Sequence, residues 1–188
     1  GTKRVHIDTL AVSSVACPGT YGVVAEPNGN VAWLGGYFTG SGLYRANFSA
    51  ATCTKIETGS SVTAMTLDLA GNVWAAGYNT NTIHKVSAAG VLLGTYPAGG
   101  TNPHGLSVDF QGNLWIVNHG PTPNMSKMNT ATGALIGTYP LGAPGVPDAD
   151  PYLYSDFTGL QIDRQAPYAR VGSWSTTHDG GAAAIPWS

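Results

Sequence analysis

The stretch Thr63–Trp74, which reads TAMTLDLAGNVW, decides the fold because it recurs along the chain. Its counterparts are Tyr21–Trp33 (YGVVAEPNGNVAW) and His104–Trp115 (HGLSVDFQGNLW), so that the three tryptophans fall 41 residues apart. A second segment is also repeated downstream: Leu93–Pro97 (LGTYP) has a close counterpart in Ile136–Pro140 (IGTYP). Self-similarity at a fixed period of this length indicates a repeat architecture.

Each copy contains four runs typical of β-strands. In the second copy these runs are Ala64–Leu69, Asn72–Gly77, Thr82–Ser87 and Val91–Tyr96. The connections are so short that only antiparallel neighbours can be joined, which predicts a four-stranded meander. A meander of this size buries too little apolar surface alone, and stacking against its neighbours stabilises it. We therefore predict an all-β protein built from β-propeller blades, with a repeat of about 42 residues.

The repeat supplies about four blades' worth of sequence. The predicted units are a partial blade at 1–20 with outer strands at Arg4–Thr9 and Ser13–Cys17, blades at 21–60, 61–101 and 102–142, an insertion at 143–156, the start of a next blade at 157–163, and a tail or further β module at 164–188. A ring of six or seven blades needs roughly 250–295 residues. We expect a partial propeller, as a fragment of a longer chain; a dimer that completes the ring and a four-bladed ring are the alternatives.

Composition narrows the classes of protein. The 188 residues include 26 Gly and 12 Pro, while 43% are hydrophobic, which fits many short strands around a core and excludes a helical bundle. The net charge is −2 and only 8 residues are Lys or Arg, so there is no basic stripe for nucleic acid or an anionic membrane. No apolar stretch approaches the roughly 18 residues of a membrane span.

The two cysteines, Cys17 and Cys53, lack the CxxC spacing of a zinc site. Few Lys and Glu, with abundant Thr, Ser, Gly and Asn, are typical of an exported bacterial protein. We expect the chain to be secreted, periplasmic or on the cell surface. In such a compartment the two cysteines could form one disulfide, if their Cα atoms come within about 7 Å.

The repeat resembles a known family. Gly-x3-Asp, then Gly-Asn-Leu/Val-Trp, then a strand such as Ile83–Lys85 is similar to the NHL and streptogramin-lyase-like (virginiamycin B lyase-like) propellers over roughly residues 4–163. In the lyases a His that opens a first strand serves in C–O bond cleavage, with a Glu, a second His and Mg²⁺. His104 matches the first position, whereas Asn118 and Pro121 occupy the other two. Asn cannot act as a carboxylate ligand or a general base.

Several residues are candidates for a binding surface. First-strand starts cluster around the channel of a propeller, so Tyr21, Thr63, His104 and Thr158 should lie close together. Loops after the second strands should extend that surface. The predicted ligand-binding residues are Tyr21, Tyr37, Tyr78, Asn79, His104, Asn118 and His119.

Other notable residues have mainly structural interpretations. A Trp on each second strand fills the space between blades. Asp68, Asp109 and Asp163 each precede a turn, where an Asp accepts backbone N–H groups. The insertion carries Asp148, Asp150 and Asp156, whose carboxylates could hold Ca²⁺ but lack the EF-hand spacing.

For function we expect a non-catalytic binding or scaffold module, with a small polar ligand or a protein bound at the loops around the channel and no cofactor. One alternative is a lyase-like enzyme that uses His104 with Mg²⁺. The other is a self-assembling structural unit, a homo-oligomer whose sheets associate edge to edge.

Overall fold

The computed structural model describes residues 1–6, 8–18, 21–37, 40–141 and 151–153. These residues form fourteen strands, and the prediction of an all-β fold is confirmed. The N-terminal pair is β1 (Thr2–Val5) and β2 (Val12–Val15). The first sheet comprises β3 (Val23–Ala25), β4 (Val31–Gly36), β5 (Gly42–Asn47) and β6 (Thr52–Ile56); the second, β7 (Val62–Leu67), β8 (Val73–Gly77), β9 (Thr82–Val86) and β10 (Leu92–Pro97); the third, β11 (Pro103–Val108), β12 (Asn113–Asn118), β13 (Asn124–Asn129) and β14 (Leu135–Pro140).

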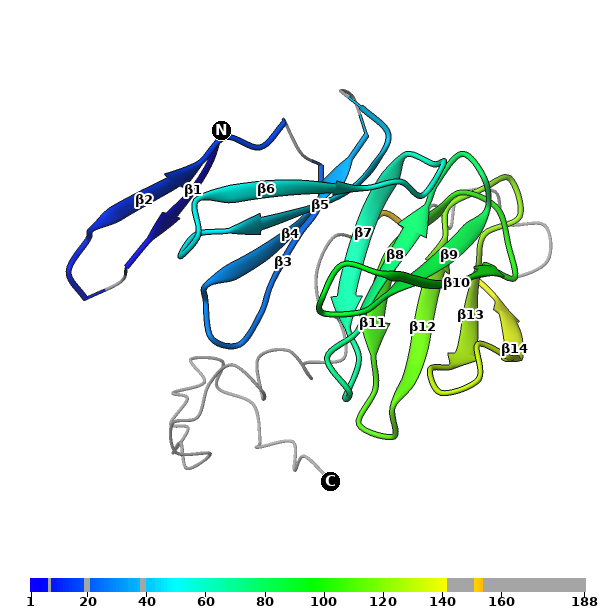
Figure 1. The fold of residues 1–188 in the computed structure, drawn as a ribbon. Helices are drawn as coiled ribbons and strands as arrows, with labels where there is room; N and C mark the ends of the chain where they lie inside the picture. The colour runs from blue at the N-terminus through cyan, green and yellow to red at the C-terminus, as the bar shows by residue number, and fades with distance from the viewer. Residues whose placement is uncertain (7, 19–20, 38–39, 142–150, 154–188) are drawn as a thin grey trace, which may run out of the picture.

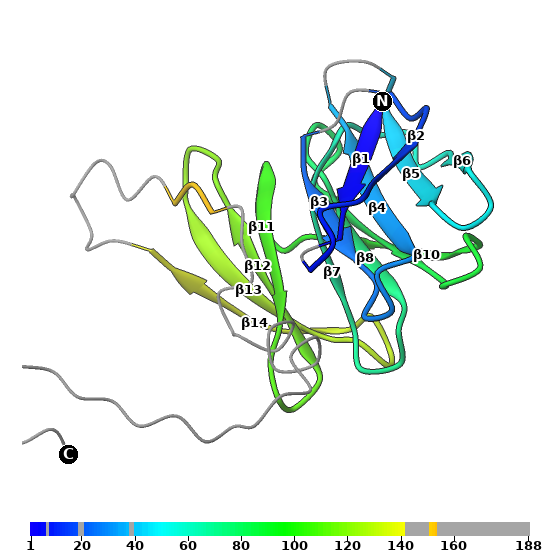
Figure 2. The same cartoon turned by 90° about the vertical axis from the view of Figure 1, so that its left-hand side faces the viewer.

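Each sheet is an antiparallel meander whose strands are ordered in space as they are in the chain. Figure 1 shows the N-terminal pair at one side, followed by the three sheets in succession. The first strands β3, β7 and β11 contact one another in turn, so they form the inner edge of the stack. Figure 2, turned by 90°, shows that the outer strands of the third sheet splay away from this edge. The four runs predicted in the second copy coincide with β7–β10 to within two residues.

An aspartate fixes the turn between the first two strands of the second and third sheets. Asp68 Oδ1 accepts hydrogen bonds from the backbone N–H of Ala70 (3.0 Å) and Asn72 (2.8 Å). Asp109 does the same for Gln111 and Asn113. The turn also needs a residue with positive φ, which Gly71 supplies at 83° without steric cost. The sequence expectation is thereby confirmed for Asp68 and Asp109, while Asp163 lies outside the described residues.

The tryptophans fill the space between sheets, as the sequence analysis predicts. Trp33 is fully buried among residues of the first and second sheets, and Trp74 among residues of the second and third. Trp115 lies on the third sheet and is only partly buried. Close approach of the backbones helps this packing: a Cβ on Gly35 would lie 2.5 Å from the carbonyl oxygen of Val62.

The same acid and tryptophan join a cation in each complete sheet. The Trp Nε1–H donates to Glu26 (3.1 Å), Asp68 (2.9 Å) and Asp109 (2.9 Å) in the three sheets. The residue paired with each Trp on the third strand is Arg45, Lys85 or Lys127, whose charge lies 4.9–5.6 Å from the indole. We call each set the acid–Trp–cation unit.

Two of these cations also bind the following sheet. Arg45 Nε donates to the carbonyl of Ala88 at 3.0 Å, and Lys85 Nζ donates to the carbonyl of Thr130 at 2.7 Å. Ala88 and Thr130 hold matching places in the turns after β9 and β13. The units of Arg45 and Lys85 therefore join the core of one sheet to a turn of the following sheet.

Asp109 shows the electrostatic effect of this arrangement. Desolvation by burial raises the pKa of its carboxyl group, but hydrogen bonds from the Asn113 backbone, Trp115, Lys127 and the Asn113 side chain outweigh it. The net pKa lies below its ordinary value. The carboxylate is therefore the stable form in the folded chain.

The N-terminal pair differs in its bounds from the prediction. The runs Arg4–Thr9 and Ser13–Cys17 were expected as strands, whereas the strands are Thr2–Val5 and Val12–Val15. The chain leaves the first strand early because it turns: Leu10 N donates to the His6 carbonyl at 2.8 Å. In the described residues no helix is long and apolar enough to cross a membrane.

A disulfide ties this pair to the first sheet. Cys17 follows β2 and Cys53 lies in β6; their Cα atoms are 5.5 Å apart and their sulfurs are bonded. Both lie in a cluster with Val15, Leu34 and Tyr44. The cross-link closes a loop between positions 36 residues apart, which restricts the unfolded chain.

We predict that Trp74→Ala lowers the free energy of unfolding by about 3–5 kcal/mol, because it empties a fully buried site between two sheets. Trp115→Ala should cost clearly less, because Trp115 is partly exposed. Urea unfolding followed by circular dichroism measures both. Equal losses of stability in the two variants would contradict the conclusion that Trp74 contributes more packing than Trp115.

We also predict that breaking the disulfide destabilises the fold by about 2–4 kcal/mol, mainly by freeing the unfolded chain. The Cys17→Ser/Cys53→Ser double variant should unfold at lower urea concentration than the oxidised protein. Reducing agent should lower the stability of the parent and leave the double variant unchanged. If reducing agent leaves the stability of the parent protein unchanged, the disulfide does not contribute to the free energy of unfolding.

Candidate functional site

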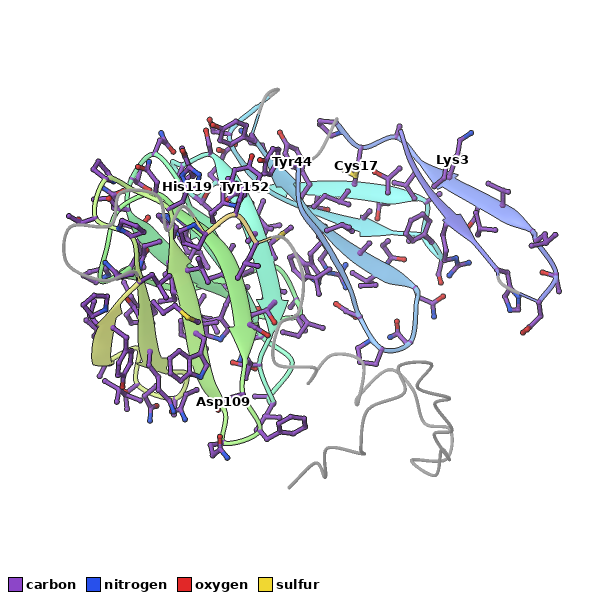
Figure 3. All side chains as sticks on the ribbon, turned by 180° about the vertical axis from the view of Figure 1, so that it is seen from behind. Lys3, Cys17, Tyr44, Asp109, His119 and Tyr152 are labelled. Carbon is purple, nitrogen blue, oxygen red and sulfur yellow. A yellow bond between two sulfur atoms is a disulfide. The ribbon has the colours of Figure 1, made fainter. Side chains whose placement is uncertain are left out.

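Six aromatic side chains gather at one end of the sheets, and we call them the aromatic cluster. They come from the approach to β3, from the residues that follow β4, β8 and β12, from β11, and from the segment 151–153. The members are Tyr21, Tyr37, Tyr78, His104, His119 and Tyr152. Figure 3 shows His119 and Tyr152 together at this end and Asp109 at the opposite end of the third sheet.

His104 is the centre of the cluster. It is buried, and its ring centroid lies 4.1 Å from that of Tyr152, 5.5 Å from His119, 5.7 Å from Tyr21 and 6.0 Å from Tyr78. Such separations are typical of stacked and edge-to-face aromatic pairs.

The outer rings close the arrangement. Tyr37 lies 4.9 Å from Tyr21 and 5.6 Å from Tyr78, and Tyr152 lies 5.2 Å from His119, measured between ring centroids. Tyr21, Tyr37, Tyr78 and His119 are half-buried, and Tyr152 is exposed. The cluster is therefore partly accessible to solvent.

Hydrogen bonds orient the central imidazole. His104 Nδ1 lies 3.3 Å from the Leu153 carbonyl oxygen, which can only accept, so Nδ1 carries a proton. In the neutral ring Nε2 is then an acceptor, and the Tyr21 hydroxyl, 3.2 Å away, donates to it. The Tyr152 hydroxyl is hydrogen-bonded to that of Tyr21. The result is a chain from an exposed phenol through a half-buried phenol to a buried imidazole.

The repeat explains why most of these rings meet. Tyr37, Tyr78 and His119 each come directly after the second strand of a sheet, and Tyr21 and His104 hold matching places five residues before Glu26 and Asp109. Equivalent positions of stacked sheets lie side by side, so the prediction places Tyr21, Tyr37, Tyr78, His104 and His119 together, as the structure does. The prediction missed Tyr152, which lies outside the repeat.

The remaining predicted residues that the structure describes contribute no ring to the cluster. Asn79 accepts a hydrogen bond from the Ser61 backbone (2.7 Å) in an exposed turn. Asn118 is fully buried, and its amide donates outward to Asn124 and Ser126 on β13. Thr63 donates to the Pro103 carbonyl, next to His104.

The acidic candidates cannot be placed. Asp148, Asp150, Asp156 and Thr158 lie outside the described residues. Within those that are described, no group of three or more His, Cys, Asp or Glu side chains is arranged to hold a metal ion.

A second histidine lies in a network of hydroxyl groups that the sequence does not reveal. His84 Nε2 is 2.8 Å from Ser60 Oγ and 3.2 Å from Thr82 Oγ1, and Nδ1 is 3.0 Å from Thr95 Oγ1. The Ser60–His84 distance suits a nucleophile and its base. Both residues are buried, however, so a substrate has no access, and the network stabilises the second sheet instead.

Stacked four-stranded meanders with their first strands at the inner edge define part of a β-propeller. The comparisons with solved structures support this class. A streptogramin B lyase matches with a TM-score of 0.57 and 22% identity over 71% of this chain and 45% of its own. Virginiamycin B lyase from Staphylococcus aureus matches with a TM-score of 0.60 and 13% identity over 76% of this chain and 48% of its own.

Similar structures also include proteins without a stated activity. One from Bacteroides caccae matches with a TM-score of 0.53 and 16% identity over 73% of this chain and 52% of its own. The chain thus spans about half the length of these propellers. No family model and no curated protein matches the sequence. The likeness to lyase propellers that the sequence predicts is confirmed at the level of the fold.

We predict a pH-dependent stability that originates at His84. Burial lowers the pKa of its imidazole below the usual value of about 6.5. As the pH falls through the unfolded value, the unfolded chain binds a proton that the folded chain refuses, so stability declines toward the lower, folded-state pKa. Above that range both states are neutral and nothing is lost.

His84→Gln should remove this decline, which reaches at most about 1.4 kcal/mol per pH unit for one proton. The measurement is urea unfolding of both proteins at about pH 7.5 and about pH 5.5. The other histidines are common to both proteins, so the difference reports His84. An unchanged pH dependence in the variant would contradict this assignment.

Proposed function

We propose that the aromatic cluster is a non-catalytic binding site for a polar ligand that carries planar rings, displayed on a propeller scaffold. The observation that carries the proposal is the convergence of six aromatic side chains from six separate segments of the chain on one end of the sheets. The scaffold holds side chains that interact across different sheets. These side chains therefore lose little conformational entropy when a ligand binds.

The chemistry of the cluster selects the ligand class. Its members are four phenols and two imidazoles, without an acid or a Lys or Arg. Phenol faces stack on planar groups, and the hydroxyls and ring nitrogens exchange hydrogen bonds. Tyr152 is exposed to solvent, and Tyr37 and Tyr78 are half-buried. A neutral or weakly charged ring with polar substituents fits this surface best.

His104 has a positioning role in this proposal. Both of its ring nitrogens have partners, the Leu153 carbonyl and the Tyr21 hydroxyl. It is buried beneath Tyr152, whose ring it contacts most closely. Its bonds orient Tyr21 and support the segment that carries Tyr152, so it shapes the site from below.

A lyase-like activity is the second candidate. Its support is the likeness to lyase propellers, among them a catalytically inactive virginiamycin B lyase in complex with quinupristin. His104 stands where the resemblance places a catalytic histidine. Asn118 stands at the expected carboxylate, and its amide nitrogen donates to Asn124 and Ser126 on β13. The residues present therefore fit binding better than metal-assisted cleavage.

The Cys17–Cys53 disulfide supports an exported location, because such bonds persist in oxidising compartments. We accordingly place this binding module outside the cytoplasm, as part of a secreted, periplasmic or surface protein.

The test is calorimetric titration of the protein with quinupristin and with a panel of small ring-bearing polar compounds. For a compound that binds, Tyr152→Ala should weaken affinity about tenfold, the equivalent of about 1.4 kcal/mol for a lost stacking contact. Tyr139→Ala is the matched control, because Tyr139 is also an exposed tyrosine but lies in β14. Equal effects of the two variants, or no binding by any compound, would refute the proposal.

The enzyme alternative predicts a different pattern. Quinupristin would be converted in the presence of Mg²⁺, with a product of changed chromatographic mobility, and His104→Ala would abolish that conversion. Binding without conversion supports the module; conversion that depends on His104 replaces it with the lyase.

A further inference from the structure

A groove of about 620 Å³ lies between β1 of the N-terminal pair and β3 of the first sheet, and we call it the β1 groove. Val5 and Val23 line it and are 53% and 65% exposed. Among the described residues β1 pairs only with β2, so its other edge presents unpaired backbone groups. An open strand edge beside exposed apolar side chains is a site for strand addition.

The turn after β1 identifies it as the third strand of a sheet. In the complete sheets Asn47 and Asn129 end the third strand, and each accepts hydrogen bonds from the backbone N–H groups two and three residues later. His6 Nδ1 accepts the same pair of bonds, from Asp8 and Thr9. Arg4 precedes His6 by two residues, as Arg45 precedes Asn47.

Arg4 also contacts the next sheet, as Arg45 and Lys85 do. Its guanidinium donates to the Gly29 carbonyl at 3.0 Å and to Asn30 Oδ1, and it lies 5.2 Å from the ring centre of Phe48. Phe48 follows Asn47 as Thr130 follows Asn129, the place that Lys85 contacts. Arg4 therefore holds the place that the cation occupies in an acid–Trp–cation unit.

The rest of that unit is not among the described residues around β1. In the three complete sheets the cation is paired across the strands with Trp33, Trp74 or Trp115. Each of these indoles donates to a carboxylate six or seven residues earlier in the sequence. The strand that belongs beside β1 would bring this tryptophan and this carboxylate to Arg4.

Self-pairing of two β1 edges is disfavoured by charge. An antiparallel pair of Thr2–Val5 segments would set Lys3 of one copy opposite Arg4 of the other. Like charges directly opposite destabilise a strand pair. The positive edge instead favours a strand that brings a carboxylate.

We propose that the β1 groove binds a β-hairpin of the same repeat type, with a carboxylate and a tryptophan six residues apart as in Asp68 and Trp74. Backbone hydrogen bonds along β1 would complete a four-stranded sheet. The indole would cover Arg4 and the exposed valines, and the carboxylate would accept the indole N–H.

The test uses a peptide with the chain's own sequence Ser61–Asn81 as the probe, titrated into the full protein. We expect saturable binding at one peptide per chain. Peptides with Trp74→Ala or Asp68→Asn should bind at least about tenfold more weakly, because the unit is broken. Arg4→Gln in the protein should have a similar effect, whereas Lys55→Gln, a control on β6, should have none.

A fused version removes the dependence on a free peptide. Gly1 lies three residues before Arg4, as Thr82 lies three before Lys85, so Ser61–Asn81 joined directly to Gly1 places the hairpin in register. The fusion should raise the melting temperature of the protein, and the same fusion with Trp74→Ala in the added hairpin should not.

The proposal is overturned if the hairpin neither binds nor stabilises the protein. It is also overturned if the Trp74→Ala hairpin gives the same results as the parent hairpin. A dimer of twice 19.3 kDa in the absence of peptide that Val5→Lys/Val23→Lys dissociates would overturn it too, because a second copy would then cover the groove. Leu69→Lys/Val91→Lys, at exposed apolar positions outside the groove, is the control for those substitutions.

Discussion

The acid–Trp–cation unit is the interaction on which the rest of the structure depends. In each complete sheet one indole donates a hydrogen bond to the acid beside the first turn and lies under the cation of the third strand. In two sheets that cation also bonds to a carbonyl of the following sheet. Two weak interactions, each modest near water, thus act on each indole, and in two sheets the cation adds a third contact. They fix strand register, turn geometry and the spacing between sheets together.

This spacing is what creates the candidate site. The aromatic cluster contains side chains from three sheets, and their ring centroids lie 4.1–6.0 Å apart only because the first strands are in contact at the inner edge. The acid of the third unit and the aromatic cluster lie at opposite ends of the third sheet, as Asp109 and His119 show. Substitutions in the cluster can therefore change recognition without disturbing the units that hold the sheets together.

Much of this could be predicted from the sequence because the repeat is local. The turn acids, the glycines of positive φ and the strand pattern all act within a dozen residues, so the second copy revealed the strands of its sheet closely. The N-terminal pair was predicted less well, because a turn at His6–Leu10 ends β1 before the apolar pattern does. The likeness to lyase propellers gave the fold, but matches below 25% identity do not carry an activity.

By itself the sequence determined the period, the all-β class and the positions that face one another in successive sheets, since equivalent residues of stacked repeats are neighbours. Only the tertiary structure decided the partners that the period does not relate. These are Tyr152 above His104, the bond between Cys17 and Cys53, the hydroxyl network of His84, and the open edge of β1. The physical reason is that such contacts join segments through the stacking of whole sheets, which no local pattern specifies.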